Sequence, residues 1–321
     1  MPPLIYLAPQ RYRDRIQSFT AEQWEDGTYR ASPGEISYGL MKHEDGLPSK
    51  RNVSALFVYF GNHIDTSYIS CGKEKQHMNC HATTHDVPFF RSKPAHDSGL
   101  YINNPRKPIN QVSSWIDGTV IYGNDETMVQ RLREFDGGRL KVDSSTDLPV
   151  LNLDRVPLMN LPSPEHHPKL QKLERLFLLG DIKSNQHPPI LALCIIWHKW
   201  HNYQAIQAAA RLKEIIDDAE TVSDEMLFHE ARRWVIASLQ NIIMYEWLPK
   251  ALEGTGLSIP EYKGYHPMVD SSVSAEFSSA AFRFGHSMIP GVFFVRQPEA
   301  DNSKTCNWTF LPMCKYWWDA Q

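Results

Sequence analysis

The segment 280–289 brings together residue types that suit the binding of a metal or a metal-containing cofactor. It reads Ala-Ala-Phe-Arg-Phe-Gly-His-Ser-Met-Ile and holds a single histidine, His286. The apolar neighbours of this histidine are Phe282, Phe284, Met288 and Ile289. They predict a buried imidazole, whose two ring nitrogens each need a partner, and a metal is one such partner. Arg283 adds a cation, and Gly285 permits close approach of the backbone. An isolated histidine is more often an ordinary core or surface residue, so the rest of the chain must supply a site around it.

The composition indicates a globular protein with a sizeable core. The chain has 321 residues, of which 42% are hydrophobic, and its net charge is −4. That charge argues against nucleic acid or an acidic membrane surface as a partner. The longest apolar run, at 190–197, is far shorter than the roughly 18–20 residues of a membrane span. The N-terminus lacks a basic region and is not predicted to be a signal peptide, so the chain is either cytosolic or a piece of a longer secreted protein.

The cysteines favour the secreted alternative. The chain has five. Cys71 lies near Cys80 and Cys306 lies near Cys314, so two disulfides that close short loops would fit an oxidising compartment. Cys194 falls in an apolar helical segment and is predicted to be a buried free thiol.

Zinc is an alternative for the first cysteine pair. The region 71–85 also holds His77, His81 and His85, which makes it rich in metal ligands. Its spacing matches no standard zinc module, because it has no Cys-x2–4-Cys knuckle. A disulfide is therefore favoured, with zinc or neither left open.

The hydrophobic pattern and the helix-capping residues predict a mainly helical protein. Helices are expected at 53–69, 125–135, 188–216, 223–252 and 274–288. The third begins at the favoured proline position with Pro188, and the fourth follows Ser223 as its N-cap. Asn124 is the expected cap of the second. The predicted buried stripe of the fourth helix is Leu227, Ala231, Trp234, Val235, Leu239, Ile242 and Ile243.

Long loops are expected between these helices. Proline and weak periodicity mark 71–108 and 149–168 as loop segments. Such long loops are usually functional or tied down. The prediction is one mainly α domain over 31–321, with long ordered loops and little β structure, after an irregular N-terminal arm at 1–30.

Several segments taken together resemble the animal haem peroxidases. In that family the histidine of the segment matched by 280–289 ligates the haem iron on its proximal side. Further matches are Asn110–Gly123, Leu178–Asp181 and Trp200–Asn202. Details at Arg51–Ser54, Phe60–His63, Glu174–Asp181, Ile236–Ile242, Tyr245–Pro249, Glu261–Tyr265 and Trp317–Asp319 are similar to the peroxidase-homology domain of dual oxidases, members of the NADPH oxidase family. The resemblance implies a peroxidase-like helical fold, haem b, and His286 as the iron ligand with Arg283 beside it.

The same resemblance implies a degraded distal side of the haem. Catalytic members read Trp-Gly-Gln-x-x-Asp-His-Asp, whereas this chain has Phe-Gly-Asn-His-Ile-Asp-Thr-Ser at 60–67. Asn62 takes the Gln position, and Asp65 stays where the family forms a haem ester. Thr66 replaces the catalytic histidine, and a hydroxyl is no base near neutral pH. His63 lies three residues earlier and would face the haem only if the register of the helix shifted.

The distal arginine is altered too. The family pattern Gly-Asp-x-Arg-x-x-Glu becomes Gly-Asp-Ile-Lys-Ser-Asn-Gln at 180–186. Lys183 keeps the positive charge of the distal arginine but lacks its planar, two-pronged guanidinium group. The alternative interpretation is that Lys183 is an ordinary solvated surface lysine. Gln186 cannot form the second haem ester.

The family's calcium loop is partly retained. Ser113, the carbonyl of Trp115, Asp117 and Thr119 supply oxygen ligands at alternating positions, as calcium prefers. Ser67 replaces the aspartate ligand from the distal helix, which leaves one carboxylate. The alternative is a turn in which Asp117 bonds its own backbone.

Two functional hypotheses follow from the resemblance, and a third possibility is a gene fragment that does not fold alone. In the first, an extracellular or lumenal peroxidase-like domain, part of a dual oxidase at the plasma membrane, uses hydrogen peroxide to oxidise a small electron donor. In the second, the domain is silent and supports contact with a maturation factor and peroxide release. The sequons at Asn52 and Asn307 fit either. The family continues beyond the segment matched here, so the domain is expected to be incomplete at its C-terminal end.

Overall fold

The computed structural model describes residues 39–40, 48–68, 95–98, 109–157, 173–181, 183–214, 222–296 and 308–312. The chain divides into two compact units. Unit 1 comprises Met1–Val58, Ile69–Gln111 and Ser272–Lys315. Unit 2 comprises Tyr59–Tyr68, Val112–Ser271 and Tyr316–Gln321. The predicted arm at 1–30 and both predicted disulfides lie outside the described residues.

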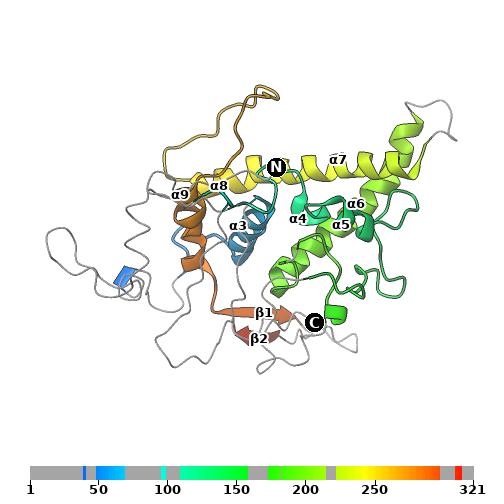
Figure 1. The fold of residues 1–321 in the computed structure, drawn as a ribbon. Helices are drawn as coiled ribbons and strands as arrows, with labels where there is room; N and C mark the ends of the chain where they lie inside the picture. Colours follow the sequence, from blue (N-terminus) through cyan, green and yellow to red (C-terminus); the bar gives the residue numbers. More distant parts are fainter. Residues whose placement is uncertain are drawn as a thin grey trace. The chain divides into compact units, whose positions relative to one another are not determined.

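Two long helices pack together and organise unit 2 (Figure 1). They are α6, Pro188–Lys213, and α7, Asp224–Ile242. Proline occupies the first turn of α6, and the Ser223 side chain caps α7 by accepting a hydrogen bond from the Met226 amide. Both predicted helices are therefore confirmed, because the signals that start them are local.

The fourth predicted helix runs to its expected end but not as a regular α-helix. A π-helical turn, η3 at Ile243–Trp247, follows α7 and leads into α8, Leu248–Leu252. The buried stripe of α7 is formed by Phe228, Ala231, Val235 and Leu239. The predicted burial of Trp234 is wrong: its side chain is 45% exposed, and its indole N–H donates to Glu230 on the same helix.

Shorter elements accompany these two helices. Helix α3, Ala55–Tyr68, confirms the expected first helix and belongs to unit 2 from Tyr59 onward. Helix α4, Thr119–Tyr122, is one buried turn of unit 2. Helix α5, Glu126–Leu132, confirms the second expected helix, but Asp125 rather than Asn124 caps it. The Asp125 carboxylate accepts from the Met128 amide at 2.8 Å. A 3-10 turn, η1, covers Leu173–Arg175.

In unit 1, the predicted helix at 274–288 is broken. Helix α9, Ala275–Ser279, ends at Ala280, whose φ of −126° leaves the helical region, and a 3-10 helix, η4 at Ala281–Met288, continues the chain. Strand β1, Val292–Arg296, then pairs antiparallel with β2, Trp308–Pro312 (Figure 1). The mainly α fold class is confirmed. Among the described residues, β1 and β2 form the one sheet, which has two strands.

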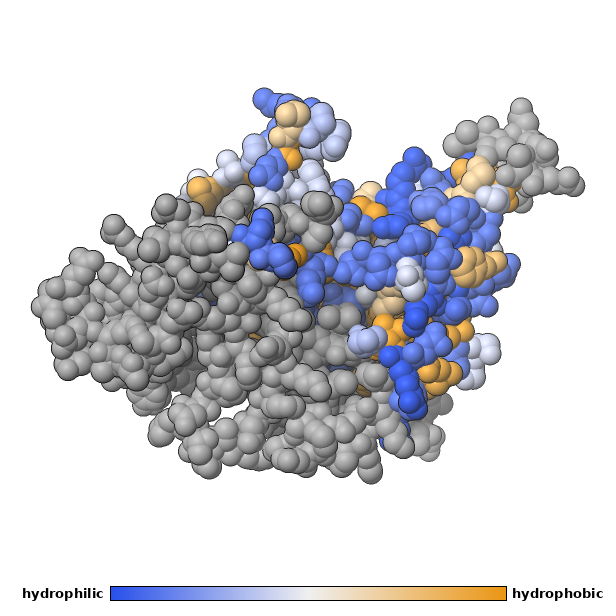
Figure 2. All heavy atoms as spheres, viewed as in Figure 1, coloured by the Kyte–Doolittle hydropathy of each residue, from blue (hydrophilic) through white to orange (hydrophobic). Residues whose placement is uncertain are grey.

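One face of the described part is mostly polar where it can be seen (Figure 2). Hydrophilic residues cover most of this face, with apolar residues scattered among them. Among the described residues, no helix is long and apolar enough to cross a membrane. Cys194 is a buried free thiol, as predicted, and burial raises its pKa to about 12.

Candidate functional site

The proximal segment forms the 3-10 helix η4 and exposes its histidine. His286 is exposed, which contradicts the predicted burial, and Phe284 is 43% exposed. The reason is that a helix of so few residues offers no second layer of side chains, so an apolar pattern alone does not fix its depth. The Arg283 guanidinium donates to the Ser278 carbonyl at 2.8 Å and so secures the junction between α9 and η4. No described atom lies within 4 Å of a Cβ built at Gly285, so the expected close backbone approach is not seen there.

Helix α3 carries the predicted distal residues of unit 2. Asn62 is exposed, whereas the next residue, His63, is fully buried. Burial lowers the pKa of His63 to about 4, which keeps this imidazole neutral at pH 7. Asp65 is buried at 8% exposure. The predicted positions Thr66 and Ser67 lie in α3, but their side chains are outside the described residues.

A close backbone contact positions the turn that carries Lys183. A Cβ on Gly180 would lie 2.3 Å from the Ile121 carbonyl oxygen and 2.6 Å from the Gly123 amide nitrogen. Only glycine allows two backbones to approach so closely. The segments 110–123 and 178–181, which the sequence singled out separately, therefore meet in space, and the turn at 181–186 follows directly from their contact.

The Asp181 carboxylate interacts electrostatically both with Lys183 on this turn and with Asp65 on α3. Asp181 is buried at 6% exposure, and one of its carboxylate oxygens accepts from the Lys183 amide at 2.5 Å. Burial raises the pKa of Asp181, and the nearby Asp65 raises it further, while Lys183 opposes the shift. The predicted residues Asp65 and Lys183 thus belong to one electrostatic cluster. Gln186 is half-buried and ends the turn, where its backbone N–H donates to the Lys183 backbone carbonyl.

His187 also belongs to this region, although no motif along the chain singles it out. Its Nε2 atom lies 3.3 Å from Asn62 Oδ1, so the start of α6 contacts α3 at one of the predicted distal residues. The contact joins residues 125 positions apart, and no local pattern reveals it.

The predicted calcium loop is closed by its own hydrogen bonds. Asp117 Oδ1 accepts from the Thr119 amide at 3.1 Å and from its hydroxyl at 2.6 Å. Ser113 Oγ accepts from the amide of Trp115 at 3.1 Å. These bonds form the turn expected as the alternative to an ion site. In the described part of the chain, no group of three or more His, Cys, Asp or Glu side chains is arranged to hold a metal.

The segment 200–202 has a structural role in α6. His201 Nε2 donates to the Gly138 carbonyl at 2.9 Å, and His201 Nδ1 then accepts from the Tyr122 hydroxyl at 2.8 Å. Asn202 makes two bonds to the backbone of Leu140. Burial lowers the pKa of His201 to about 4, so its imidazole is neutral at pH 7. Its two hydrogen bonds link α6 to α4 and to the 138–141 loop.

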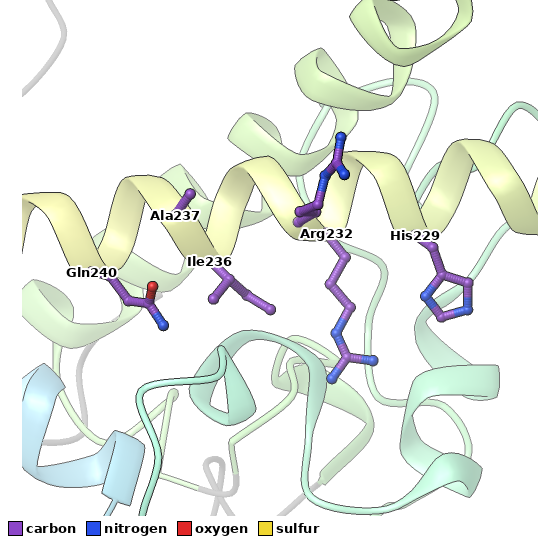
Figure 3. Close-up of a pocket in the computed structure, with 6 residues that line it drawn as sticks. His229, Arg232, Ile236, Ala237 and Gln240 are labelled. Carbon is purple, nitrogen blue, oxygen red and sulfur yellow. The ribbon is translucent and has the colours of Figure 1, made fainter. Parts of the chain in front are cut away.

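A shallow hollow of about 400 Å³ lies along α7. His229, Ile236 and Gln240 project from one side of this helix (Figure 3), and Gln240 donates to the Ile116 carbonyl at 2.7 Å. Arg232 packs its guanidinium 4.9 Å from the centre of the Tyr122 ring. The lining holds none of the residues predicted from the sequence for haem or calcium.

Comparison with known proteins decides the family. The family model for animal haem peroxidase matches residues 2–321. This chain belongs to the animal haem peroxidase family. The Dual oxidase of Drosophila melanogaster is 35% identical over 334 residues, which cover 99% of this chain and 21% of that protein. Dual oxidase 2 of Homo sapiens is 32% identical over 331 residues, covering 95% of this chain and 21% of its own length. This member of the family corresponds to the peroxidase-homology domain of dual oxidases and spans about a fifth of their length.

Solved structures confirm the peroxidase fold. Peroxidase A from Dictyostelium discoideum superposes with a TM-score of 0.71 at 24% identity, over 99% of this chain and 60% of that one. The fatty acid alpha-dioxygenase of Oryza sativa gives a TM-score of 0.62 at 16% identity, over 97% of this chain and 51% of that one. At these identities the likeness shows the fold alone.

Proposed function

We propose that this chain is the extracellular peroxidase-like domain of a dual-oxidase-type protein, that it binds haem through His286, and that it turns over hydrogen peroxide poorly. The observation that carries the proposal is a peroxidase-family chain with the proximal imidazole retained and the distal base replaced by Thr66. The electron donor would be a small molecule.

The donor chemistry of the chain fits a haem. In unit 1, His286 presents an exposed imidazole on the same short helix as the partly exposed ring of Phe284, which suits an iron ligand beside an apolar macrocycle. In unit 2, Asp65 offers a carboxylate and Gln186 an amide, so one ester to the haem is available instead of two. When bound, the haem supplies the iron at which peroxide is cleaved.

The protein groups that would move protons are the weak part of this site. A threonine hydroxyl does not accept a proton near neutral pH, and general acid–base catalysis is typically worth roughly 10²–10⁴-fold in rate. His63 is no substitute, because it is fully buried and its pKa is about 4. Lys183 still places a positive charge on the turn, as a point charge without the fork of an arginine.

The second candidate function is a silent domain that supports maturation and peroxide release of an NADPH oxidase. The replacements at Thr66, Lys183 and Gln186 favour it, because the first two remove groups that catalysis needs and the third removes one attachment point of the haem. A maturation factor and the rest of a dual oxidase would then be the partners. Asn52 is exposed beside the start of α3, so its sequon is accessible for the glycosylation expected of an extracellular domain.

Haem reconstitution tests the proposal. The purified protein is mixed with hemin, and the absorption spectrum is recorded for the unmodified chain, for His286→Ala and for His266→Ala. The control His266 is also exposed, but it lies outside the proximal segment. We expect a Soret band that only His286→Ala abolishes, together with slow peroxide consumption. A band that survives His286→Ala refutes the proposed ligand, and the absence of any band supports the silent domain.

A further inference from the structure

The hollow along α7 carries positive charge on a chain whose net charge is −4. Its described lining consists of six residues of α7, all in unit 2 (Figure 3): His229, Arg232, Arg233, Ile236, Ala237 and Gln240. None of these residues is acidic. Arg233 forms an ion pair with Glu230 at 2.8 Å. His229 Nε2 lies 2.8 Å from a carboxylate oxygen of Glu225. Two of the basic groups of the hollow therefore already have an acidic neighbour on the same helix.

Arg232 differs from these two residues. Its side chain is half-buried, and its guanidinium lies 4.9 Å from the centre of the Tyr122 ring. Within the described part of the chain, Arg232 forms no ion pair and no hydrogen bond. The ring attracts the positive charge but is no substitute for hydrogen-bond acceptors, so the guanidinium N–H groups stay available as donors. A planar guanidinium with free donors suits a carboxylate, whose two oxygens can each accept one N–H.

The surface beneath the hollow is held in place by packing. Tyr122 is fully buried, and its hydroxyl lies 2.8 Å from His201 Nδ1. Ile236 lies close to Gly118, where a Cβ would be only 3.1 Å from Ile236 Cγ1. The aromatic ring under Arg232 and the aliphatic side chain beside it are thus positioned before any ligand binds. Such preorganisation favours binding, because fewer groups lose freedom when the ligand arrives.

The lining indicates the chemical class of the ligand. Ile236 lies four residues after Arg232, so an apolar surface begins about 6 Å further along the helix axis. A ligand that matches both would have an anionic group at one end and an apolar body at the other. A carboxylate carries a single charge, which Arg232 alone can balance, whereas a phosphate group carries about −1.5 to −2 at pH 7. The volume of about 400 Å³ lies within the range of small-molecule sites, roughly 300–1,000 Å³.

We propose that the hollow along α7 binds a small organic monocarboxylate, with the carboxylate on Arg232 and the apolar body along Ile236 and Ala237. The proposal goes beyond the proposed function and does not depend on haem, because the lining holds none of the residues predicted for haem or calcium.

NMR of the ¹⁵N-labelled protein tests the ligand class, with the side-chain Nε–H resonances of the arginines as the readout. The probe is 3-phenylpropionate. One control is 3-phenylpropanamide, which has the same shape without the charge, and the other is acetate, which has the charge without the apolar body. We expect a saturable shift of the Arg232 resonance with the probe, and binding at least about tenfold weaker for each control. A response to acetate that equals the response to the probe overturns the ligand class.

Three variants test the place of binding. Arg232→Gln should weaken binding of the probe at least about tenfold, because it removes the charge-assisted hydrogen bonds. Ala237→Glu should do the same by repulsion while leaving Arg232 in place, since Ala237 is exposed and can accept a longer side chain. Arg155→Gln is the matched control, because Arg155 is 70% exposed and pairs with Glu174 outside the hollow. We expect it to leave the affinity unchanged.

Two outcomes overturn the proposal. Affinity that survives both Arg232→Gln and Ala237→Glu would place the probe elsewhere. The absence of any Arg232 shift with 3-phenylpropionate would exclude a small carboxylate, and a shift caused instead by a peptide of glutamates would identify an acidic protein segment as the occupant.

Discussion

At the scale of single residues, the proposed distal position is where we expect the chemistry of this chain to depart from that of a catalytic peroxidase. Asn62 and Asp65 lie on α3, and Lys183 lies on a turn that the buried Asp181 couples to that helix. The predicted distal residues Asn62, Asp65 and Lys183 therefore lie on two segments that interact with each other. In the proposed function, Thr66 limits proton transfer, because a threonine hydroxyl does not accept a proton near neutral pH.

Restoring the base should restore turnover. In the haem-loaded protein, we expect Thr66→His to raise the rate of peroxide consumption by roughly 10²-fold or more, since it supplies general acid–base catalysis. Adding Lys183→Arg should raise it further, and the two effects should be non-additive because both groups act on one O–O cleavage. Stopped-flow absorption measures the rates. Rapid peroxide consumption by the unmodified protein would show that another group is the base.

The loop at Asp117 offers a residue-scale test for calcium. The bonds from Thr119 to Asp117 Oδ1 need only an oxygen acceptor, whereas calcium needs the charge. Calcium at 100 times its Kd would stabilise the protein by about 2.7 kcal/mol. We expect that gain in the unmodified protein and its loss in Asp117→Asn, which keeps the turn. Melting curves with calcium or with EDTA measure it, and identical curves would assign this loop to the turn alone.

At the scale of secondary-structure elements, a close contact at Gly180 joins two of the segments that resemble the peroxidase family. Ile121 and Gly123 flank the end of α4, and Gly180 lies directly against them. The contacting atoms belong to backbone, which cannot rotate aside as a side chain can. This packing decides where Asp181 and Lys183 lie.

A methyl group at Gly180 should therefore be costly. We expect Gly180→Ala to destabilise unit 2 by about 1–3 kcal/mol or more, the usual cost of overpacking, and to weaken haem uptake. Gly285→Ala is the matched control, because a Cβ there meets nothing within 4 Å. Urea unfolding followed by circular dichroism compares the two variants. Equal stability of both would show that the segments can separate without cost.

The elements that sequence predicted well are those with local signals. Proline in the first turn of α6 and the Ser223 cap of α7 depend on neighbouring residues only, so both helices were expected at nearly the right bounds. The contact of His187 with Asn62 depends on two elements meeting, and no pattern along the chain records it. The exposure of His286 has the same origin, since burial depends on what packs over η4 rather than on its own apolar residues.

At the scale of the whole molecule, the described part of unit 2 contains several buried histidines whose pKa is lowered. They are His63, His187, His198 and His201, and burial lowers the pKa of each to about 4. In the unfolded chain the same groups titrate near pH 6.5. Between these values the unfolded chain binds protons that the folded chain excludes. Their stabilising contribution is therefore fully present above pH 6.5 and is lost as the pH falls toward 4.

The size of these pKa shifts predicts that the fold is sensitive to acid. Each histidine lowers the free energy of unfolding by up to about 1.4 kcal/mol per pH unit within that window. Asp181 acts in the opposite direction, because its raised pKa means that the folded chain takes up its proton more readily. Because four histidines oppose one aspartate, the free energy of unfolding should fall steeply as the pH falls. A typical domain has a free energy of unfolding of only about 5–15 kcal/mol.

We therefore predict that the protein unfolds on acidification near pH 5, before most carboxylates titrate. Urea denaturation between pH 7.5 and 5 should show the free energy of unfolding falling by several kcal/mol. His198→Gln is the sharpest variant, because the glutamine NH₂ can still donate to the Lys141 carbonyl that His198 Nε2 contacts at 2.9 Å. Removing this one titrating group should flatten the slope by about 1.4 kcal/mol per pH unit while leaving stability at pH 7.5 nearly unchanged. A slope that is flat in the unmodified protein would mean that these imidazoles are reached by protons, and water, in the folded state.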